Sequence, residues 1–203
     1  MVDAWCAKRD TETNRSYETR TRVIRTFIDY LRCRDLTDVL PLTALRPEPK
    51  IYTPYAFEEN ELKRFFNECD SIKPYLGRRA SVIRKFTVPV FFRLLYSTGM
   101  RTTEARLLRT ENVDLERGVI DIQRSKGYDQ HYVAMHDTMT NLMTRYNQAI
   151  SILQPSRAYF FQSSKGPHYS RDWVQDNFRT LWNKVNGSMA SPVANDVRHH
   201  MQQ

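Results

Sequence analysis

The sequence predicts a mainly α-helical protein with a small antiparallel β-sheet, that is, an α+β fold. Apolar residues recur at helical spacing over most of the chain, both before and after its middle. Residues 112–137 instead alternate, are rich in Val, Ile and Tyr, and carry turn signals at Gly118 and at residues 125–129. Residues 40–55 hold four prolines, which favour extended backbone and predict a linker.

Three long helices are predicted before the sheet. Residues 16–34 place an apolar stripe among several arginines, and the stripe consists of Val23, Ile24, Phe27, Ile28 and Leu31. Residues 56–72 form the second helix, with two glutamates near its start. The third covers residues 81–99; Pro89 predicts a break or restart within it, and Gly99 predicts its end.

A short amphipathic helix follows at residues 101–108. Thr102 or Thr103 is expected to cap it, and the stripe Ala105, Leu107 and Leu108 is expected to face the core. Beyond the sheet, helices are predicted at residues 137–153 and 171–185, and residues 191–203 begin another. This pattern divides the chain into a helical domain at 1–40, a linker at 41–54 and a larger domain at 55–203.

The composition favours a polyanionic partner. Among 203 residues, 31 Lys and Arg face 23 Asp and Glu, so the formal charge is +8 and nucleic acid is the leading candidate. No apolar run is long enough to span a bilayer, so we expect no membrane partner and a cytoplasmic protein. The three cysteines and the histidines lack metal-ligand spacing, so neither a metal nor a cofactor is expected.

Arg101 lies at the start of a helix, where the helix dipole disfavours a cation. One interpretation is a solvated arginine paired with Glu104, three residues later. The other is an anion site, because a guanidinium offers a planar fork of donors to phosphate oxygens and a helix N-terminus adds backbone donors. The local sequence leaves both interpretations open.

Three short motifs occur in a fixed order along the chain: TGMRTTEA at residues 98–105, SKG at 125–127 in a predicted hairpin, and NDVRHH at 195–200. They resemble the first-arginine motif, the lysine motif and the His-x-x-Arg box of the tyrosine recombinase (phage integrase) family. Residues 15–31 are similar to part of that family's helical core-binding domain. Residues 52–66 are similar to the beginning of its catalytic domain, which makes residues 1–40 a partial core-binding domain.

The resemblance implies DNA strand transesterification, in which a tyrosine attacks a phosphodiester and forms a 3′-phosphotyrosyl bond without metal or ATP. Arg101 and Arg198 would then bind the nonbridging oxygens, which gain charge in the transition state. Lys126 would protonate the leaving sugar oxygen. Glu104 would orient Arg101 or a neighbour, although an ordinary surface carboxylate is an equal alternative.

The sequence departs from the family pattern near its end. Asn195 stands where the family usually has histidine, and His199 matches a histidine often found beside the arginine but does not refill position 195. The family's nucleophilic tyrosine follows the second arginine, and residues 199–203 contain none. Tyr159 and Tyr169 are rejected as substitutes because both precede Arg198.

These departures lead us to expect a recombinase catalytic domain truncated before its nucleophile, which cannot cleave DNA by itself. The alternative is a catalytically inactive DNA-binding remnant or regulator. Double-stranded DNA is the expected partner, with self-association into a synaptic oligomer for the complete protein and a location near the nucleoid. An unrelated helix-turn-helix regulator would leave the order of Arg101, Lys126 and Arg198 unexplained.

Overall fold

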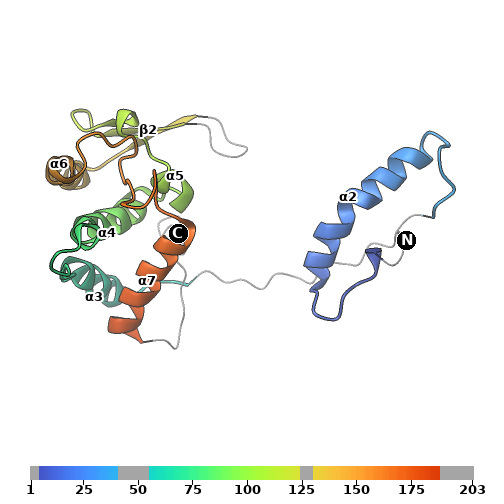
Figure 1. Cartoon of the computed structure of the whole chain (residues 1–203), viewed down its shortest axis with the longest axis horizontal. Coiled ribbons are helices and arrows are strands. Elements are labelled where there is room, and N and C mark those ends of the chain that lie inside the picture. Colours follow the sequence, from blue (N-terminus) through green and yellow to red (C-terminus); the bar gives the residue numbers. More distant parts are fainter. Residues whose placement is uncertain (1–4, 41–54, 124–129, 188–203) are drawn as a thin grey trace. The chain divides into compact units, whose positions relative to one another are not determined.

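A computed structural model describes residues 5–40, 55–123 and 130–187. The chain divides into two compact units, Met1–Thr53 and Pro54–Gln203 (Figure 1). The division falls inside the predicted linker at residues 41–54. The interpretation of residues 1–40 as a partial core-binding domain stays a prediction, and each unit is described by itself.

Unit 1 contains α2 (Asn14–Arg32), whose N-cap Thr13 accepts a hydrogen bond from the Ser16 N–H at 3.2 Å. The helix begins two residues before the predicted start. Only part of its predicted apolar stripe is inward: Ile28 is buried, whereas Val23 and Phe27 are 74% and 57% exposed. The described residues of this unit cover one side of α2, so the stripe extends past the surface they bury.

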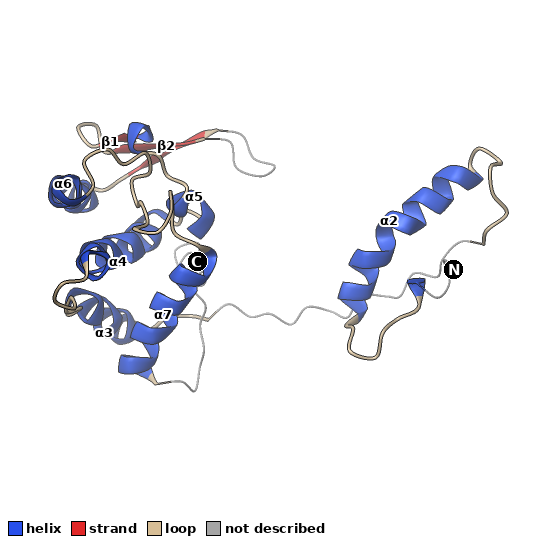
Figure 2. Ribbon diagram, in the orientation of Figure 1, coloured by secondary structure: helices blue, strands red, loops and turns tan. Residues whose placement is uncertain are grey.

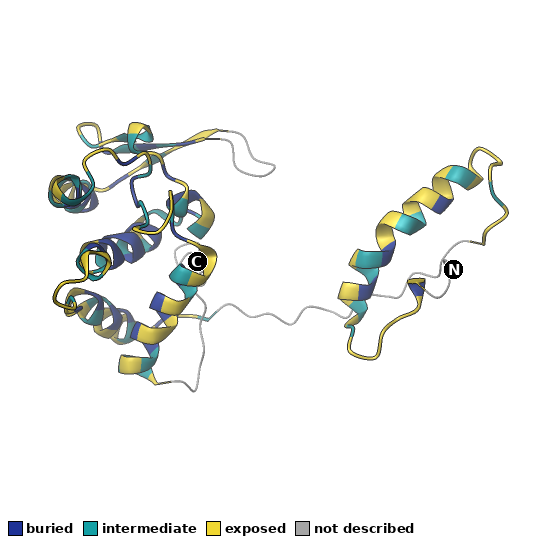
Figure 3. Ribbon diagram, in the orientation of Figure 1, coloured by how far each residue is buried: buried dark blue, intermediate teal, exposed yellow. Residues whose placement is uncertain are grey.

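Unit 2 begins with α3 (Glu59–Asp70), which packs against α4 (Arg79–Thr98) and α7 (Arg171–Asn186) (Figure 2). The interface is aromatic, with ring centroids 5.1–5.8 Å apart for the contacts that Phe178 makes with Phe65, Phe92 and Trp182. All four rings are almost fully buried, and Figure 3 shows the buried faces of these helices turned toward one another. The core that supports the candidate site is therefore rigidly packed.

The predicted break at Pro89 is wrong, because α4 is continuous from Arg79 to Thr98. Pro89 removes one N–H donor, and the carbonyl four residues earlier belongs to the exposed Lys85. The helix buries Val88, Val90 and Phe91 around this position. This burial, together with contacts to α3 and α6, outweighs the cost of one missing backbone hydrogen bond.

The sheet follows α5 (Thr102–Arg106) and the 3-10 turn η1 (Thr110–Asn112). Its strands are β1 (Val113–Asp114), β2 (Val119–Ile122) and β3 (His131–Ala134), in the order β1-β2-β3, with both pairs antiparallel. Ile120 and Ile122 are buried and Val119 and Asp121 are not, which is the predicted alternation. Gly118 has φ +66 and connects β1 to β2, where an added Cβ would lie 2.8 Å from Thr140 Oγ1.

The chain then forms α6 (Asp137–Leu153), which has the predicted bounds and packs on α4. A loop leads from α6 to α7, which begins at Arg171 as predicted. The described residues therefore confirm the predicted fold class of helices with a small antiparallel sheet. No helix among them is long and apolar enough to cross a membrane.

Candidate active site

Arg101 lies in the turn that joins α4 to α5. Gly99 ends α4 with φ +64, a left-handed conformation that glycine adopts without strain. Met100 is buried and anchors the turn, and Arg101 is the N-cap of α5 with extended backbone. The predicted capping by Thr102 or Thr103 is wrong, since both lie inside the helix.

Glu104, and not a threonine, forms the side-chain hydrogen bond to the backbone at the start of α5. Its Oε2 accepts a hydrogen bond from the Arg101 backbone N–H at 2.7 Å, and its Oε1 accepts one from Arg101 Nη1 at 2.6 Å. The Glu104 side chain is 3% exposed and that of Arg101 is 31% exposed. A buried carboxylate that bonds both the backbone and the guanidinium fixes the direction of the arginine.

This geometry bears on the two interpretations of Arg101. The pairing with Glu104 is present, but it is not a solvated surface pair, because the carboxylate is buried. A guanidinium has five N–H donors, so pairing with a carboxylate is compatible with binding an anion. The anion-binding role of Arg101 stays a prediction.

Leu108 and Ala105 are buried below α5, as predicted, whereas Leu107 is 42% exposed and does not belong to the core. Leu107 is the C-cap of a helix of only five residues, so the helical periodicity does not extend to it. After α5 the backbone contacts a distant segment, where the Leu108 carbonyl accepts a hydrogen bond from the Phe160 N–H at 2.8 Å. This contact ties the end of α5 to the loop that follows α6.

Arg106, the last residue of α5, makes a long-range contact that the sequence pattern did not reveal. Its Nη1 donates to the Tyr169 carbonyl at 2.8 Å, which joins α5 to the segment before α7. Burial, and secondarily the charge of Arg171, lowers the pKa of Arg106. The sequence around Arg106 predicts an ordinary surface residue. Only its hydrogen bond to the carbonyl of Tyr169, 63 positions later, distinguishes it.

Tyr169 is poorly placed for nucleophilic attack. Tyr169 is buried, stacks on Trp173 with ring centroids 3.7 Å apart, and has its pKa raised by burial. A nucleophilic hydroxyl needs an accessible position and a lowered pKa or an adjacent base. Tyr159 packs against His168 and Arg109 through its ring. The burial of Tyr169 supports its rejection, whereas the rejection of Tyr159 stays a prediction.

A carboxylate holds the neck of the β2–β3 hairpin. Asp121 accepts hydrogen bonds from Gln123 Nε2 at 2.7 Å and from Gln130 Nε2 at 2.8 Å. These two glutamines flank residues 124–129, so Asp121 joins the two sides of the segment that carries Lys126. Lys126 itself lies outside the described residues, as do Asn195, Arg198 and His199. The convergence of these residues with Arg101 therefore stays a prediction.

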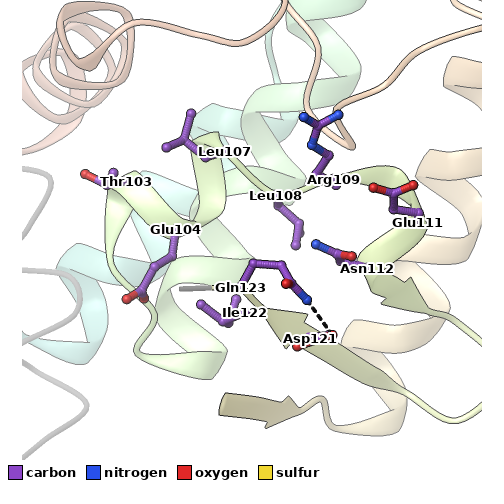
Figure 4. A pocket seen from close by; sticks show the side chains of 10 residues that line it. All are labelled: Thr103, Glu104, Leu107, Leu108, Arg109, Glu111, Asn112, Asp121, Ile122 and Gln123. Carbon is purple, nitrogen blue, oxygen red and sulfur yellow. Dashed lines mark hydrogen bonds between the residues drawn. The ribbon is translucent and has the colours of Figure 1, made fainter. Parts of the chain in front are cut away.

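An open cavity of about 720 Å³ lies between α5, η1 and the hairpin neck (Figure 4). Its lining comprises Thr103, Glu104, Leu107, Leu108, Arg109, Glu111, Asn112, Asp121, Ile122 and Gln123. Three carboxylates against one guanidinium make it unsuited to a phosphate by itself. Glu104 lines this cavity and also pairs with Arg101, so one carboxylate belongs to both the acidic cavity and the Arg101 turn.

Two of the three histidines in the described segments, His136 and His168, have local polar contacts. His136 is the N-cap of α6, and its Nδ1 accepts from the Thr138 N–H at 3.3 Å. His168 Nδ1 lies 3.1 Å from the Tyr169 carbonyl. Within residues 5–40, 55–123 and 130–187, no group of three His, Cys, Asp or Glu side chains is arranged to hold a metal ion.

Comparison with known proteins identifies the family of this chain. The family model described as the phage integrase family matches residues 56–202. A putative integrase/recombinase, y4rE of Sinorhizobium fredii, is 29% identical over 190 residues, covering 91% of this chain and 59% of the relative. Tyrosine recombinase XerC of Oceanobacillus iheyensis is 25% identical over 179 residues, covering 85% of this chain and 54% of the relative.

Solved structures share the fold. The XerH site-specific recombinase bound to its palindromic difH substrate, in a post-cleavage complex, superposes with a TM-score of 0.69 at 15% identity, covering 93% of this chain and 55% of that one. The Tn1549 transposon integrase in complex with transposon right end DNA gives 0.64 at 14% identity, covering 98% and 70%. The chain spans little more than half the length of the two curated relatives described above. Its match over residues 56–202 shows that the chain belongs to the phage integrase family.

Proposed function

We propose that this chain carries part of the catalytic domain of a site-specific DNA recombinase, and that it binds duplex DNA with the phosphate to be exchanged beside Arg101. The observation that carries the proposal is the guanidinium of Arg101, directed by the buried carboxylate of Glu104, in a chain of net charge +8. Family membership and DNA-bound structural neighbours support the same partner.

The proposed reaction exchanges one phosphodiester for another. A tyrosine hydroxyl attacks the phosphorus and gives its proton to solvent, and its oxygen becomes bonded to the 3′-phosphate. The bond from phosphorus to the 5′-oxygen of the next nucleotide breaks, and that oxygen leaves protonated. Arg101 and Arg198 stabilise the charge that grows on the nonbridging oxygens. Lys126 donates the proton to the leaving oxygen. In the family pattern that the chain resembles, the attacking tyrosine follows the second arginine, which is Arg198 here.

The electrostatics of the pair explain why Arg101 needs these partners. Arg101 and Glu104 together carry no net charge, so their contribution to phosphate binding is geometric more than it is a gain in positive potential. A phosphate at this turn therefore requires further cations, and Lys126 and Arg198 supply them in this proposal. The cavity beside β2, with its three carboxylates, would lie outside the path of the DNA backbone.

The test compares duplex binding by the wild-type chain, Arg101→Gln and Arg101→Lys across a salt series. Loss of one phosphate contact should reduce the slope of log K against log[salt] by about 1 for Arg101→Gln. Arg101→Lys retains the charge and serves as the matched control, so its slope should equal that of the wild type. A salt-independent affinity for the wild-type chain would reject DNA as the partner. Equal slopes for wild type and Arg101→Gln would remove Arg101 from the DNA interface.

A further inference from the structure

A second cavity, of about 350 Å³, lies between the first turn of α4 and the segment that follows α6. Its described lining contains two arginines and no aspartate or glutamate, and consists of Arg79, Ile83, Gln154, Pro155, Ser156, Arg157, Gln162, Ser163 and Ser164. The cavity beside α5 is the opposite case, with three carboxylates and one arginine. Neither the family resemblance nor the proposed function assigns a role to the second cavity.

Arg157 is the buried charge of this cavity, with 8% of its surface exposed. Its guanidinium donates to three neutral acceptors: Ser151 Oγ at 2.9 Å, the Phe160 carbonyl at 3.3 Å and Asn147 Oδ1. No carboxylate of the described segments forms a salt bridge with it. Burial also lowers the pKa of Arg157, which reports the cost of holding this charge away from water. A buried cation held only by neutral groups is stabilised strongly by an anion.

The start of α4 adds to the positive potential on the other side of the cavity. Arg79 is the first residue of a 20-residue helix whose first turn holds no acidic residue and whose N-cap, Arg78, makes no side-chain capping bond. Such a helix start presents backbone N–H groups and the positive end of the helix dipole. Arg79 is exposed at the rim, so it can close over a ligand that reaches Arg157.

The side chain of Gln154 indicates which chemical groups the ligand carries. Its Oε1 is buried and has no hydrogen-bond partner, and the residue lines the cavity. A ligand with anionic oxygens for the two arginines and one O–H donor would satisfy this acceptor once the Gln154 amide turns toward the cavity. Hydrogen phosphate and the monoanion of a phosphate monoester have such an O–H group, whereas sulfate at neutral pH has none. We propose that this cavity binds the phosphate group of inorganic phosphate or of a phosphate monoester.

The cavity is distinct from the Arg101 site. Arg79 and Arg101 lie at opposite ends of α4, and a helix of 20 residues is about 30 Å long at ~1.5 Å per residue. One phosphate cannot contact both ends. The inference therefore does not depend on the proposed recombinase function, and variants at the two ends separate the two sites.

The experiment is calorimetric titration of the chain with inorganic phosphate and, separately, with adenosine monophosphate, at neutral pH and constant ionic strength. Arg79→Gln should weaken binding of both about tenfold, the loss expected for one charged hydrogen-bonded contact. Arg79 is exposed, so this substitution leaves the buried core unchanged. Arg171→Gln is the matched control, because Arg171 is also an exposed first residue of a helix, and it should bind both ligands as the wild type does.

Two further variants sharpen the result. Ser164→Asp places a carboxylate at the exposed rim and should abolish binding, and Arg101→Gln should leave phosphate binding at the cavity intact. The proposal is overturned if Arg79→Gln binds phosphate as tightly as the wild type or if phosphate binding is lost in Arg101→Gln. Equal affinity for sulfate and phosphate would also overturn it, and so would displacement of phosphate by unphosphorylated duplex DNA, since a phosphodiester has no O–H donor.

Discussion

The two ends of α4 place arginines in opposite electrostatic settings. At the C-terminal end, Arg101 is 31% exposed and faces the buried carboxylate of Glu104. Near the N-terminal end, Arg157 is buried and bonds only neutral acceptors. Both arrangements fix a guanidinium in space. The carboxylate does so by cancelling the positive charge locally, whereas the neutral acceptors leave the full charge to attract an anion.

This difference in charge explains why, in our proposals, the Arg101 site needs further cations to bind a phosphate and the Arg157 cavity does not. A neutral arginine–glutamate pair orients a phosphate but attracts it weakly, so Lys126 and Arg198 must complete the site in our proposal. The Arg157 cavity has its own excess of positive charge, with Arg79 and the start of α4 beside it. Substitutions that exchange charged for neutral partners test this difference.

The largest effect is expected at Glu104. Glu104→Ala removes the acceptor of the Arg101 N–H and leaves its guanidinium without the carboxylate, so the free energy of unfolding should fall by about 2–4 kcal/mol. Glu104→Gln keeps an oxygen acceptor and should cost about 1 kcal/mol. Urea unfolding followed by tryptophan fluorescence in a Trp5→Phe background checks both, because Trp173 and Trp182 then report on unit 2.

The two substitutions control for each other, since only one of them removes both acceptor oxygens. Equal destabilisation by Ala and Gln would mean that the negative charge alone matters. A negligible effect of Glu104→Ala would show that the buried carboxylate does not hold the turn between α4 and α5.

A smaller loss is expected from Arg157→Lys. The ammonium retains the charge but cannot reach Ser151, Asn147 and the Phe160 carbonyl together, so unfolding free energy should fall by about 1–2 kcal/mol. Added inorganic phosphate should raise the free energy of unfolding of the wild type more than that of this variant. Arg93→Lys, which removes a bidentate pair with Asp70 on a more exposed surface, is the control and should cost less than about 1 kcal/mol. Equal losses at both positions would contradict a special role for burial at Arg157.

Sequence reasoning predicted the elements whose stability is local. The bounds of α6 follow from its regular apolar spacing, and the end of α4 follows from the left-handed conformation of Gly99. It failed at Pro89, because contacts with other helices decide whether one lost hydrogen bond breaks a helix. The pair between Arg101 and Glu104 was predictable from a spacing of three residues, but the burial of Glu104 was not.

No pattern in the sequence predicts the Arg157 site. Asn147, Ser151 and Phe160 follow no motif, and Arg79 lies 78 positions earlier in the chain. What distinguishes this arginine is a missing carboxylate among its described neighbours, and a sequence cannot display that. Arg106 escaped prediction for a related reason, since its partner is a backbone carbonyl on a distant segment.

If Glu104 acts on DNA by directing Arg101, the effects of the two residues on duplex affinity are coupled. This coupling is measured at one salt concentration with the wild type, Arg101→Gln, Glu104→Gln and the double variant. We expect Glu104→Gln to weaken binding about 3- to 10-fold, although it removes a negative charge, and to have no further effect in the Arg101→Gln background. Tighter binding by Glu104→Gln, or an equal effect in both backgrounds, would contradict the claim and reduce Glu104 to a charge that opposes DNA.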